Sequence, residues 1–571
     1  MKRILTLVLL ALLIIDTRLV LAAPQYIDAP ALDSVVKTPV GNVKSGTVQL
    51  PLITWGADIR TLYANGGKAA TDKDSLFGKA GLDLRLQRID DFKKQLDSYI
   101  KGESPYLRGT LGMVNMASSL LARDGRTKPV IIYQLSESAG GDALVVKRGI
   151  KNAKGLKGKT IALQAYGPHV DYLTTILKDA DLKVSDVTLK WLPDLTGTDN
   201  APMAAFYEKD IDAAMVIIPD ALALTSGGNV GSGAEDSVKG ARILLSTKTA
   251  NRVIADVYAV RSDYFKDHRE QVEKLVHSLM IARDQVADLV AKKSANADDY
   301  NRLMRNAAGF LLDSAEAVSD TEALYGDAQH VDYHGNIQFF EDSNYPRNFT
   351  LRSKESQRSF ITLGLLTTTK LPAKAGWNYK KFETGLTAVK SSTQPRFKKK
   401  EVATVVAKKQ QQGNLEEGEL FSFEVYFQPN QNTFSAELYE ASFTKVVELA
   451  ATYGGAIITV EGHSDPLGYL KQKKAGQQEI VLKRVKQSAK NLSLTRANSV
   501  RDAVVAFAKA KNIVLDSSQF ASVGHGISRP KSGLCGADPC APKNKQEWLN
   551  NMRVEFRLIQ VEAEADVFQP L

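Results

Sequence analysis

Cysteine is scarce in this sequence, which has only Cys535 and Cys540 among 571 residues. In an exported protein, two cysteines this close together typically form one disulfide that closes a loop. A metal site built on them would need more ligands, and no histidine lies near the pair. We therefore predict a disulfide between Cys535 and Cys540, and no metal site.

Long apolar runs are missing beyond residue 22, where no stretch approaches the roughly 20 residues of a membrane-spanning helix. The usual catalytic motifs are missing as well: a Gly-x-Ser-x-Gly elbow, a P-loop, a His-Glu-x-x-His zinc motif and a paired-carboxylate signature. These absences argue against an enzyme. We expect a binding protein that needs no cofactor.

The N-terminus has the order of a secretory signal peptide. Met1-Lys2-Arg3 is charged, residues 4–15 are apolar, and small residues follow at Ala22-Ala23. We expect cleavage after Ala22, which removes residues 1–22 and delivers the chain to the periplasm of a Gram-negative bacterium. The alternative is an uncleaved segment that serves as a membrane anchor.

The formal net charge of +10 is concentrated in two polar stretches. Residues 380–409 hold nine Lys or Arg against two Glu, and residues 471–490 hold seven against one, so the remainder of the chain is slightly acidic. This distribution, together with export, argues against a nucleic-acid partner. A basic tether near an anionic wall or membrane surface fits it better.

Composition divides the chain into three blocks. Residues 48–378 alternate short β-rich runs with amphipathic helices, residues 379–418 have the polar and basic composition of a linker, and residues 419–562 resume the alternation. The fold class predicted is α/β in both folded blocks. This alternation predicts open parallel sheets, whose ligands bind beyond the carboxyl ends of the strands. We expect the linker to be extended and to act as a tether between the two folded blocks.

A set of short motifs in the first block carries a resemblance. The motifs are Ser75-Leu-Phe-Gly-Lys-Ala-Gly-Leu-Asp-Leu-Arg-Leu86, Gly109-Thr-Leu-Gly-Met113, Leu156-Lys-Gly-Lys-Thr-Ile-Ala162 and Ile211-Asp-Ala-Ala-Met-Val-Ile-Ile-Pro-Asp220. In this order they resemble the nitrate, sulfonate and taurine group of type II periplasmic binding proteins. The resemblance implies a two-lobed clamshell, with the second lobe at about 148–250, a small-molecule ligand and a possible ABC permease partner. Thiamine-precursor synthases share this clamshell.

Polar and aromatic residues that follow predicted strands are the candidates for the ligand site of the clamshell, because such junctions offer free backbone N–H groups and helix N-termini. The candidates are Thr54, Trp55, Asp58, Thr110, Tyr166, Gly167, His169 and Asp220. Trp55 and Tyr166 could hold a ligand between their rings, or each could only pack within its lobe. His169 and Asp58 could instead be helix-start residues.

Four linked motifs stand out in the C-terminal block. They are Gly462-His-Ser-Asp465, Leu492-Ser-Leu-Thr-Arg-Ala497, Gly524-His-Gly526 and Asn551-Met-Arg-Val-Glu555. Together they resemble the OmpA-like peptidoglycan-binding domain. The resemblance implies that Asp465 and Arg496 hold the diaminopimelate of the stem peptide, a residue that offers an ammonium and carboxylates. Asn430 and Arg553 fall where the family places supporting contacts.

The sequence departs from the family's pattern between Asp465 and Arg496. The family spaces these positions about fifteen apart, and here a basic insert of about sixteen residues widens the gap. The insert could be a solvated loop or could add affinity for anionic glycan polymers. Position 428 is Gln and position 552 is Met, where the family usually has an acidic residue and Arg.

The blocks together predict a small-molecule-binding clamshell anchored non-covalently to peptidoglycan at the outer-membrane side of the periplasm. The first alternative is a structural or regulatory envelope protein whose clamshell contacts another protein. A second alternative, an ion-driven stator subunit with an OmpA-like tail, would require a retained membrane helix.

Overall fold

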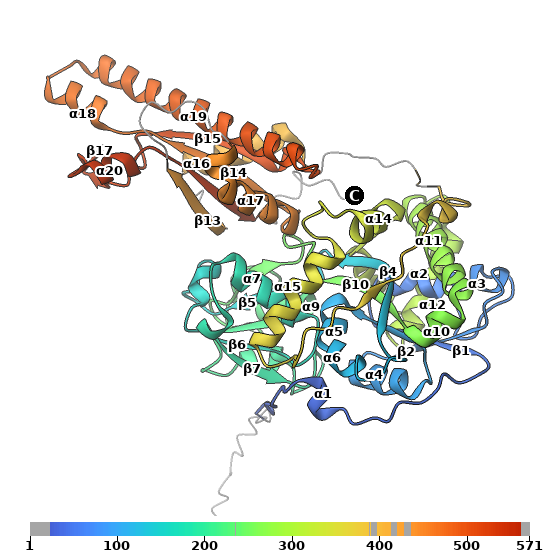
Figure 1. Cartoon of the computed structure of the whole chain (residues 1–571). Coiled ribbons are helices and arrows are strands. Elements are labelled where there is room, and N and C mark those ends of the chain that lie inside the picture. The colour runs from blue at the N-terminus through green and yellow to red at the C-terminus, as the bar shows by residue number, and fades with distance from the viewer. Residues whose placement is uncertain are drawn as a thin grey trace, which may run out of the picture.

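The computed structural model describes residues 23–234, 236–387, 389, 397–412, 419–426 and 436–560. Two lobes make up the first block, and a smaller domain with its own sheet follows (Figure 1). All three parts combine strands and helices, so the predicted α/β class is confirmed. Within the described ranges no helix is long and apolar enough to cross a membrane, and the predicted signal peptide 1–22 lies outside these ranges.

Lobe 1 is built on a mixed sheet of order β11-β4-β10-β3, with β12 beside β4, and on the parallel pair β1-β2. Its strands are β1 (Val48–Leu52), β2 (Leu84–Arg88), β3 (Tyr106–Thr110), β4 (Pro129–Ser138), β10 (Ala255–Arg261), β11 (Ala328–His330) and β12 (Ala373–Lys374). Its helices are α1 (Leu32–Val35), α2 (Asp58–Ala64), α3 (Leu76–Lys79), α4 (Phe92–Lys101), α5 (Leu111–Met116), α6 (Ser118–Leu121), α10 (Ser262–Asp267), α11 (Arg269–Ala291), α12 (Ala297–Leu311), α13 (Val318–Gly326), α14 (Tyr333–Glu341) and α15 (Phe349–Thr362).

Lobe 2 is built on a five-stranded sheet of order β7-β6-β8-β5-β9. Its strands are β5 (Asp142–Val146), β6 (Thr160–Gln164), β7 (Thr188–Leu192), β8 (Ala213–Ile217) and β9 (Arg242–Ser246), and its helices are α7 (His169–Asp179), α8 (Pro202–Phe206) and α9 (Ile218–Leu224). The chain passes between the lobes twice, from β4 to β5 and from β9 back to β10.

These sheets are mixed, which corrects the prediction of open parallel sheets. β10 runs antiparallel to both β3 and β4, and β5 runs antiparallel to β8 and β9. The reason is the double crossing, because a chain that enters lobe 2 along β4 must come back along β10 in the opposite direction. The apolar sequence of residues 109–115 predicts one more strand, but β3 ends at Thr110. The Thr110 hydroxyl accepts a hydrogen bond from the Met113 N–H and begins helix α5 there.

Helix α15 bridges the two lobes. Arg352 pairs with Glu137 of β4 at 2.5 Å, and Ser356 Oγ donates to Asp171 Oδ1 of α7 at 2.7 Å. Figure 1 shows α15 running across both lobes in front of α5 and α7. The lobes are therefore joined by a helix in addition to the two crossing strands.

The C-terminal domain has a four-stranded sheet of order β13-β18-β14-β15, with helices α17 and α19 packed on its apolar face. Its strands are β13 (Glu419–Tyr426), β14 (Ala456–His463), β15 (Phe520–Gly526), β18 (Arg553–Gln560) and the short hairpin β16 (Leu534–Cys535) and β17 (Asp538–Pro539). Its helices are α16 (Lys399–Gln412), α17 (Ala436–Thr452), α18 (Leu467–Lys474), α19 (Glu479–Ala510) and α20 (Lys545–Asn550). The predicted Cys535–Cys540 disulfide is confirmed.

Part of the predicted linker 379–418 is folded. Tyr379 and Phe382 are buried in the core of lobe 1, and Val402, Val405 and Val406 of α16 pack on the C-terminal sheet. The composition is polar because α16 exposes most of its surface and buries only a narrow apolar stripe.

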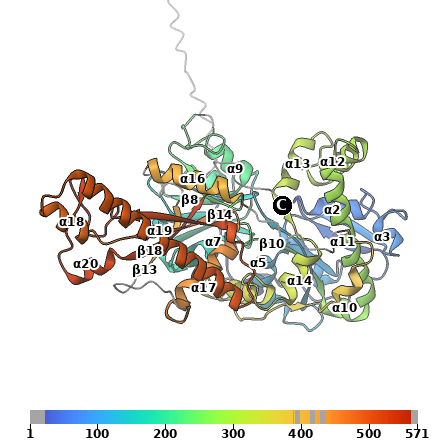
Figure 2. The same ribbon diagram turned by 90° about the horizontal axis from the view of Figure 1, so that it is seen from above.

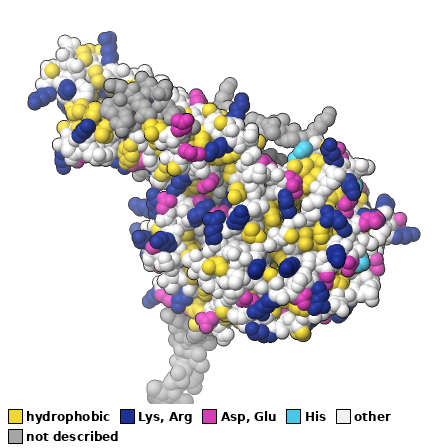
Figure 3. Space-filling model, in the orientation of Figure 1, with side chains coloured by type: hydrophobic (Ala, Val, Ile, Leu, Met, Phe, Trp, Pro, Cys, Tyr) yellow, Lys and Arg dark blue, Asp and Glu magenta, His cyan; other side chains and the backbone are white. Residues whose placement is uncertain are grey.

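The basic insert is helical, which corrects the prediction of a loop. Residues 467–474 form α18, and α19 begins at Glu479, so that Arg496 lies inside this 32-residue helix and not at its start. Tyr469 of α18 and Leu482 of α19 share a small apolar cluster with Ile527. Figure 3 shows Lys and Arg side chains gathered at this projecting end of the molecule.

The C-terminal domain is docked on lobe 2, beside α7 (Figures 1 and 2). Tyr453 Oη donates to Asp179 Oδ2 at 2.9 Å, Lys445 pairs with Asp181 at 2.7 Å, and the Gly455 N–H donates to the Thr249 carbonyl at 3.1 Å. The predicted extended tether is thus replaced by a direct contact between the two folded blocks.

Candidate functional site

The junction between the lobes brings several of the predicted ligand residues together. β4 ends at Ser138 and β5 begins at Asp142, with two glycines between them. A Cβ atom on Gly141 would lie 2.5 Å from the Trp55 ring, so the indole packs directly on the junction backbone. Trp55 therefore packs against the connection between the two lobes.

A chain of hydrogen bonds extends from Trp55 into lobe 1. Its Nε1 donates to Ser136 Oγ at 3.1 Å, and Ser136 Oγ donates to Asp256 Oδ2 at 2.8 Å. Asp256 Oδ1 accepts from Arg108 Nη1 at 2.9 Å. Ser136 and Asp256 lie side by side on β4 and β10, so this chain fixes the indole to the two crossing strands.

Asp58 is a buried ion-pair partner, which corrects the prediction that it faces a ligand. Its side chain is fully buried, and both carboxylate oxygens accept from Arg108, with Nη2 at 2.7 Å and Nε at 3.1 Å. Burial raises the pKa of Asp58 to about 6, and the Arg108 guanidinium opposes that rise. A ligand could reach this carboxylate only by displacing Arg108.

His169, at the start of α7, belongs to a second polar group at the junction. Its Nε2 is 2.8 Å from Asp142 Oδ1, and Asp142 Oδ2 accepts from Ser138 Oγ at 2.6 Å. Ser138 Oγ is also 2.9 Å from Thr247 Oγ1, on the return crossing. His169 is completely buried, and its Nδ1 has no hydrogen-bond partner.

Asp220 lies near His169, at the start of α9. Its Oδ1 accepts from Thr196 Oγ1 at 3.0 Å, while its buried Oδ2 has no hydrogen-bond partner. Burial raises the pKa of Asp220, and the nearby His169 lowers it. The junction thus holds a carboxylate oxygen and a ring nitrogen that are both buried and both without a hydrogen-bond partner among the described residues.

Tyr166 and Gly167 have local roles. Tyr166 has the unusual φ of +61°, its hydroxyl donates to the Pro30 carbonyl at 2.6 Å, and the Lys93 ammonium lies 4.8 Å from its ring centre. Trp55 and Tyr166 make no ring contact in the described part of the chain. A Cβ on Gly167 would lie 2.2 Å from Gln164 Oε1, which explains glycine at the turn into α7.

The two candidate threonines organise backbone. The Thr54 N–H and hydroxyl both donate to Asp90, at 2.6 and 3.0 Å. Thr110 caps α5. Of the eight predicted residues, the structure groups Trp55, His169 and Asp220 around the junction.

Sequence reasoning missed Ser136, Ser138 and Asp142, which hold the junction together. The signal was present in the segment Ser136-Glu-Ser-Ala-Gly-Gly-Asp142, a polar, glycine-containing connection between two apolar strands. Arg108 and Asp256 carried no such signal, because each sits alone within a strand and only the pairing of β3 with β10 brings them together.

The predicted peptidoglycan residues Asp465 and Arg496 lie near the region where the ends of β14 and β15 meet α19. Gly526 N donates to Ser493 Oγ at 2.9 Å, and Ser464 Oγ donates to the Ala489 carbonyl at 3.1 Å. Asp465 directly follows Ser464, and Arg496 is one helical turn beyond Ser493.

Both side chains are half-buried and incompletely paired. Asp465 Oδ2 accepts from the Leu467 N–H at 3.1 Å, whereas Oδ1 is buried without a partner, as is Arg496 Nε. Burial raises the pKa of Asp465 and lowers that of Arg496. Arg553, in contrast, points to the other face of the sheet and donates to Glu424 at 3.0 Å, and Asn430 lies outside the described residues.

Comparisons with known proteins add a family to this description. Residues 69–287 match the model of the family described as NMT1/THI5 like. No curated protein matches the chain. The match covers the whole lobe 2 sheet and, in lobe 1, the elements from α3 to β4 and from β10 into α11.

Solved structures with similarity to the chain include binding proteins and an enzyme. The periplasmic aliphatic sulphonate-binding protein SsuA of Escherichia coli has 14% identity and a TM-score of 0.40, over 62% of this chain and 96% of its own. The alkanesulfonate-binding protein SsuA of Xanthomonas axonopodis pv. citri has 16% and 0.39, over 58% and 98%. The desulfurization enzyme DSZB has 17% and 0.34, over 60% and 96%. Over residues 69–287, therefore, the chain is similar to NMT1/THI5-like proteins.

Proposed function

We propose that this chain is a periplasmic binding protein that captures a small polar molecule between its two lobes and holds to peptidoglycan through its C-terminal domain. The similarity to NMT1/THI5-like proteins supports the first half. A permease of the ABC type is the natural recipient of such a ligand. The motifs around Asp465 and Arg496 support the second half.

The observation that carries the ligand site is the pair of unsatisfied polar atoms at the lobe junction. His169 Nδ1 and Asp220 Oδ2 are both buried without a partner, and each costs free energy until a partner arrives. A ligand with a donor for Asp220 and a polar group for His169 would satisfy both atoms. Trp55 would then cover its apolar part.

A test of the ligand site compares Asp220→Asn and Trp55→Ala with a matched control. Thermal shift against a panel of amines, amino acids, sulfonates and pyrimidines identifies a ligand of the wild type. We expect each variant to lose most of the shift, about tenfold or more in affinity, because an imperfectly paired buried group costs about 1–3 kcal/mol. Tyr166→Phe, whose hydroxyl contacts only Pro30, serves as the control. Unchanged affinity in both junction variants would remove the site.

For the wall, the supporting observation is that Asp465 Oδ1 and Arg496 Nε are buried and unpaired in the same region of the domain. A carboxylate and a guanidinium match the ammonium and carboxylate of diaminopimelate. Asp465→Asn and Arg496→Gln should each weaken sedimentation with purified sacculi roughly 30-fold or more, since truncating one partner of a desolvated charge pair costs about 2–5 kcal/mol.

The control for the wall test is Lys509→Gln, an exposed residue on the same helix as Arg496. It should bind sacculi like the wild type, and circular dichroism should show an intact fold in all three variants. Wild-type binding by Asp465→Asn or Arg496→Gln would exclude the proposed wall contact.

A clamshell that contacts another protein is the second candidate. It is favoured by the bonds of α15 to both lobes and by the internal pairing of Asp58, Asp142 and Asp256. Two results together would favour this candidate over the first. No small molecule would shift the melting temperature of the wild type, and an envelope protein that cross-links to the wild type would no longer cross-link to the junction variants.

A further inference from the structure

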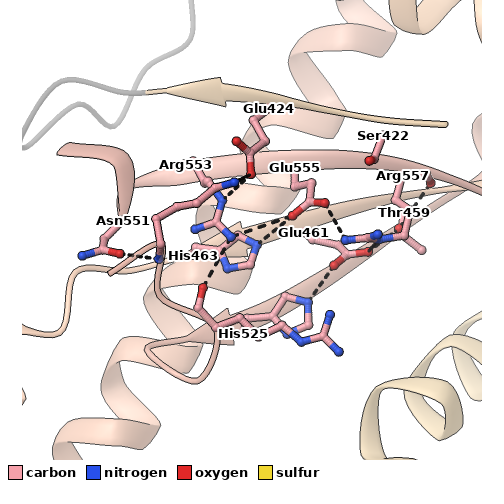
Figure 4. A network of polar contacts seen from close by, with 12 residues as sticks. Ser422, Glu424, Thr459, Glu461, His463, His525, Asn551, Arg553, Glu555 and Arg557 are labelled. Atoms are coloured by element: carbon pink, nitrogen blue, oxygen red, sulfur yellow. Dashed lines mark hydrogen bonds and ion pairs between the residues drawn. The ribbon is translucent and has the colours of Figure 1, made fainter. Parts of the chain in front are cut away.

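One face of the sheet in the C-terminal domain carries a group of buried polar side chains. Residues alternate along each strand, so that β14 presents Thr459, Glu461 and His463 on this face, and β18 presents Glu555 and Arg557 beside them. His525 comes from β15, the neighbour of β14 on its other side. Figure 4 shows these side chains converging above the sheet.

Three of these residues form a compact cluster of metal-binding groups. Glu461, His463 and His525 each place one ligand atom within 4.8 Å of the other two. All three are buried, with 0%, 2% and 5% of their surface exposed. The imidazole rings are stacked, with centres 4.9 Å apart.

His463 is the residue that ordinary packing does not explain. It is almost fully buried, yet neither ring nitrogen has a hydrogen-bond partner of normal geometry among the described residues. Its polar neighbours are Glu555 Oε2, 3.7 Å from Nε2, and the Arg529 backbone. Buried polar groups are paired in the great majority of cases. One nitrogen of a neutral imidazole carries a lone pair, and His463 has no hydrogen bond at that nitrogen to give up on binding a metal ion.

We propose that Glu461, His463 and His525 bind a divalent transition-metal ion of the zinc class. Two imidazoles and one carboxylate are a ligand set that zinc takes, and imidazole disfavours magnesium and calcium. Glu555 Oε2 lies 3.7 Å from His463 Nε2 and supplies a fourth ligand, or a water takes that position. The site is independent of both halves of the proposed function.

The surroundings orient the ligands. Glu461 Oε1 accepts from Thr459 Oγ1 at 2.7 Å and from Arg557 Nε at 3.0 Å, which leaves Oε2 for the metal. Oε2 now lies 2.8 Å from His525 Nε2, and on binding that hydrogen bond is exchanged for two metal bonds, as the proton of the neutral imidazole moves from Nε2 to Nδ1.

The neighbouring arginines pair with the carboxylates in and around the cluster. Arg553 pairs with Glu424 at 3.0 Å and lies 3.8 Å from Glu555, and Arg557 pairs with Glu419, Glu461 and Glu555. A hollow of about 560 Å³, lined by Glu424, Arg529, Lys531, Arg553 and Glu555 among others, reaches Glu555, which lies 3.7 Å from His463.

The test uses the full mature chain without an affinity tag, because a histidine tag would itself bind zinc. Protein stripped with a chelator is titrated with Zn²⁺ by calorimetry and with Co²⁺ by visible absorption. We expect one ion per chain, with a tetrahedral cobalt spectrum. His463→Gln and His525→Gln should each weaken binding at least tenfold. His277→Gln should not, because this half-buried histidine lies on α11 of lobe 1, where it contacts the Thr384 carbonyl and the Phe382 ring.

A second measurement covers the case that the variants fail to fold. Anomalous diffraction at the zinc edge, from crystals of the wild type grown with Zn²⁺, should give a peak between Glu461, His463 and His525. Absence of stoichiometric zinc binding by the wild type, zinc binding by folded His463→Gln equal to that of the wild type, or an anomalous peak only elsewhere would each overturn the proposal.

Discussion

At the scale of residues, the lobe junction is organised by charges that are removed from water. Arg108 is fully buried between Asp58 and Asp256, at 2.7 and 2.9 Å. Each ion in such a triad carries a desolvation cost that only its partners offset. Removing one partner therefore affects stability more than any exposed pair in the molecule can.

We predict that Asp58→Asn lowers the free energy of unfolding by about 3–5 kcal/mol, because it leaves the buried Arg108 with one carboxylate. Urea unfolding followed by tryptophan fluorescence measures this. Asp299→Asn removes an exposed i,i+3 pair with Arg302 and should change little. Equal stability of the two variants would mean that the triad contributes nothing.

Asp327 makes the junction sensitive to pH. Burial raises its pKa to about 6, its side chain lies beside Gly140, and Lys248 partly offsets the rise. A raised folded-state pKa gives full stability below the ordinary pKa near 4, and that stability is lost as the pH rises through 6. We predict that Asp327→Asn is about 1–3 kcal/mol more stable than the wild type at pH 8, and equal to it at pH 4.

The measurement for Asp327 is chemical unfolding at several pH values between 4 and 8. Asp320→Asn, which changes an exposed carboxylate of the same helical segment, should follow the wild type throughout. A constant difference between Asp327→Asn and the wild type at all pH values would rule out this explanation.

At the scale of elements, close contacts between backbones set where strands meet helices. A Cβ on Gly462 would lie 2.0 Å from the Ser493 carbonyl oxygen, so only glycine lets β14 approach α19. Asp465 and Arg496 depend on the same contact for their positions.

We predict that Gly462→Ala lowers the melting temperature by several degrees and weakens sedimentation with sacculi, because the strand must move away from the helix. Gly468→Ala is the matched control. A Cβ at Gly468 meets nothing within 4 Å, and Gly468 lies in α18, where alanine favours the helix. A Gly462→Ala protein as stable as the control would contradict this account.

The elements that could be predicted from the sequence are those with a clear local period. The spacing of Val272, Leu275, Val276 and Leu279 predicts an amphipathic helix, which is confirmed as α11. The run from Phe520 to Gly526 predicts a strand, which is confirmed as β15. The sequence of the insert after residue 470 suggests a solvated loop because most of its residues are polar. The apolar stripe that makes it helical is narrow and includes Leu482 and Val485. The pairing of strands that unites Glu461 with His525 is a long-range property, which local patterns do not contain.

At the scale of the whole molecule, the two folded blocks are in direct contact. A Cβ on Gly455 would lie 1.8 Å from the Lys248 carbonyl oxygen, so the C-terminal domain touches the return crossing of the clamshell backbone to backbone. Arg252 Nη1, on that same crossing, donates to the Ala451 carbonyl at 3.1 Å.

We predict that Gly455→Ala separates the domains, because the added methyl group cannot be accommodated without moving one backbone. Small-angle X-ray scattering should show a larger radius of gyration, with unchanged circular dichroism. Gly125→Ala, where a Cβ meets nothing within 4 Å, should scatter like the wild type. An unchanged radius for Gly455→Ala would mean that the docked arrangement does not persist in solution.

The docking site has a mechanical consequence. Three residues of the C-terminal domain contact lobe 2 and its hinge. Tyr453 bonds to α7, Lys445 pairs with the turn after α7, and Gly455 bonds to the return crossing. When lobe 2 rotates against lobe 1, the C-terminal domain must therefore rotate with lobe 2 as one body. The 32-residue helix α19 is itself about 48 Å long at 1.5 Å per residue, and its basic end lies far from the hinge (Figure 1). A small change of angle at the hinge therefore becomes a displacement of many ångströms at the basic tip.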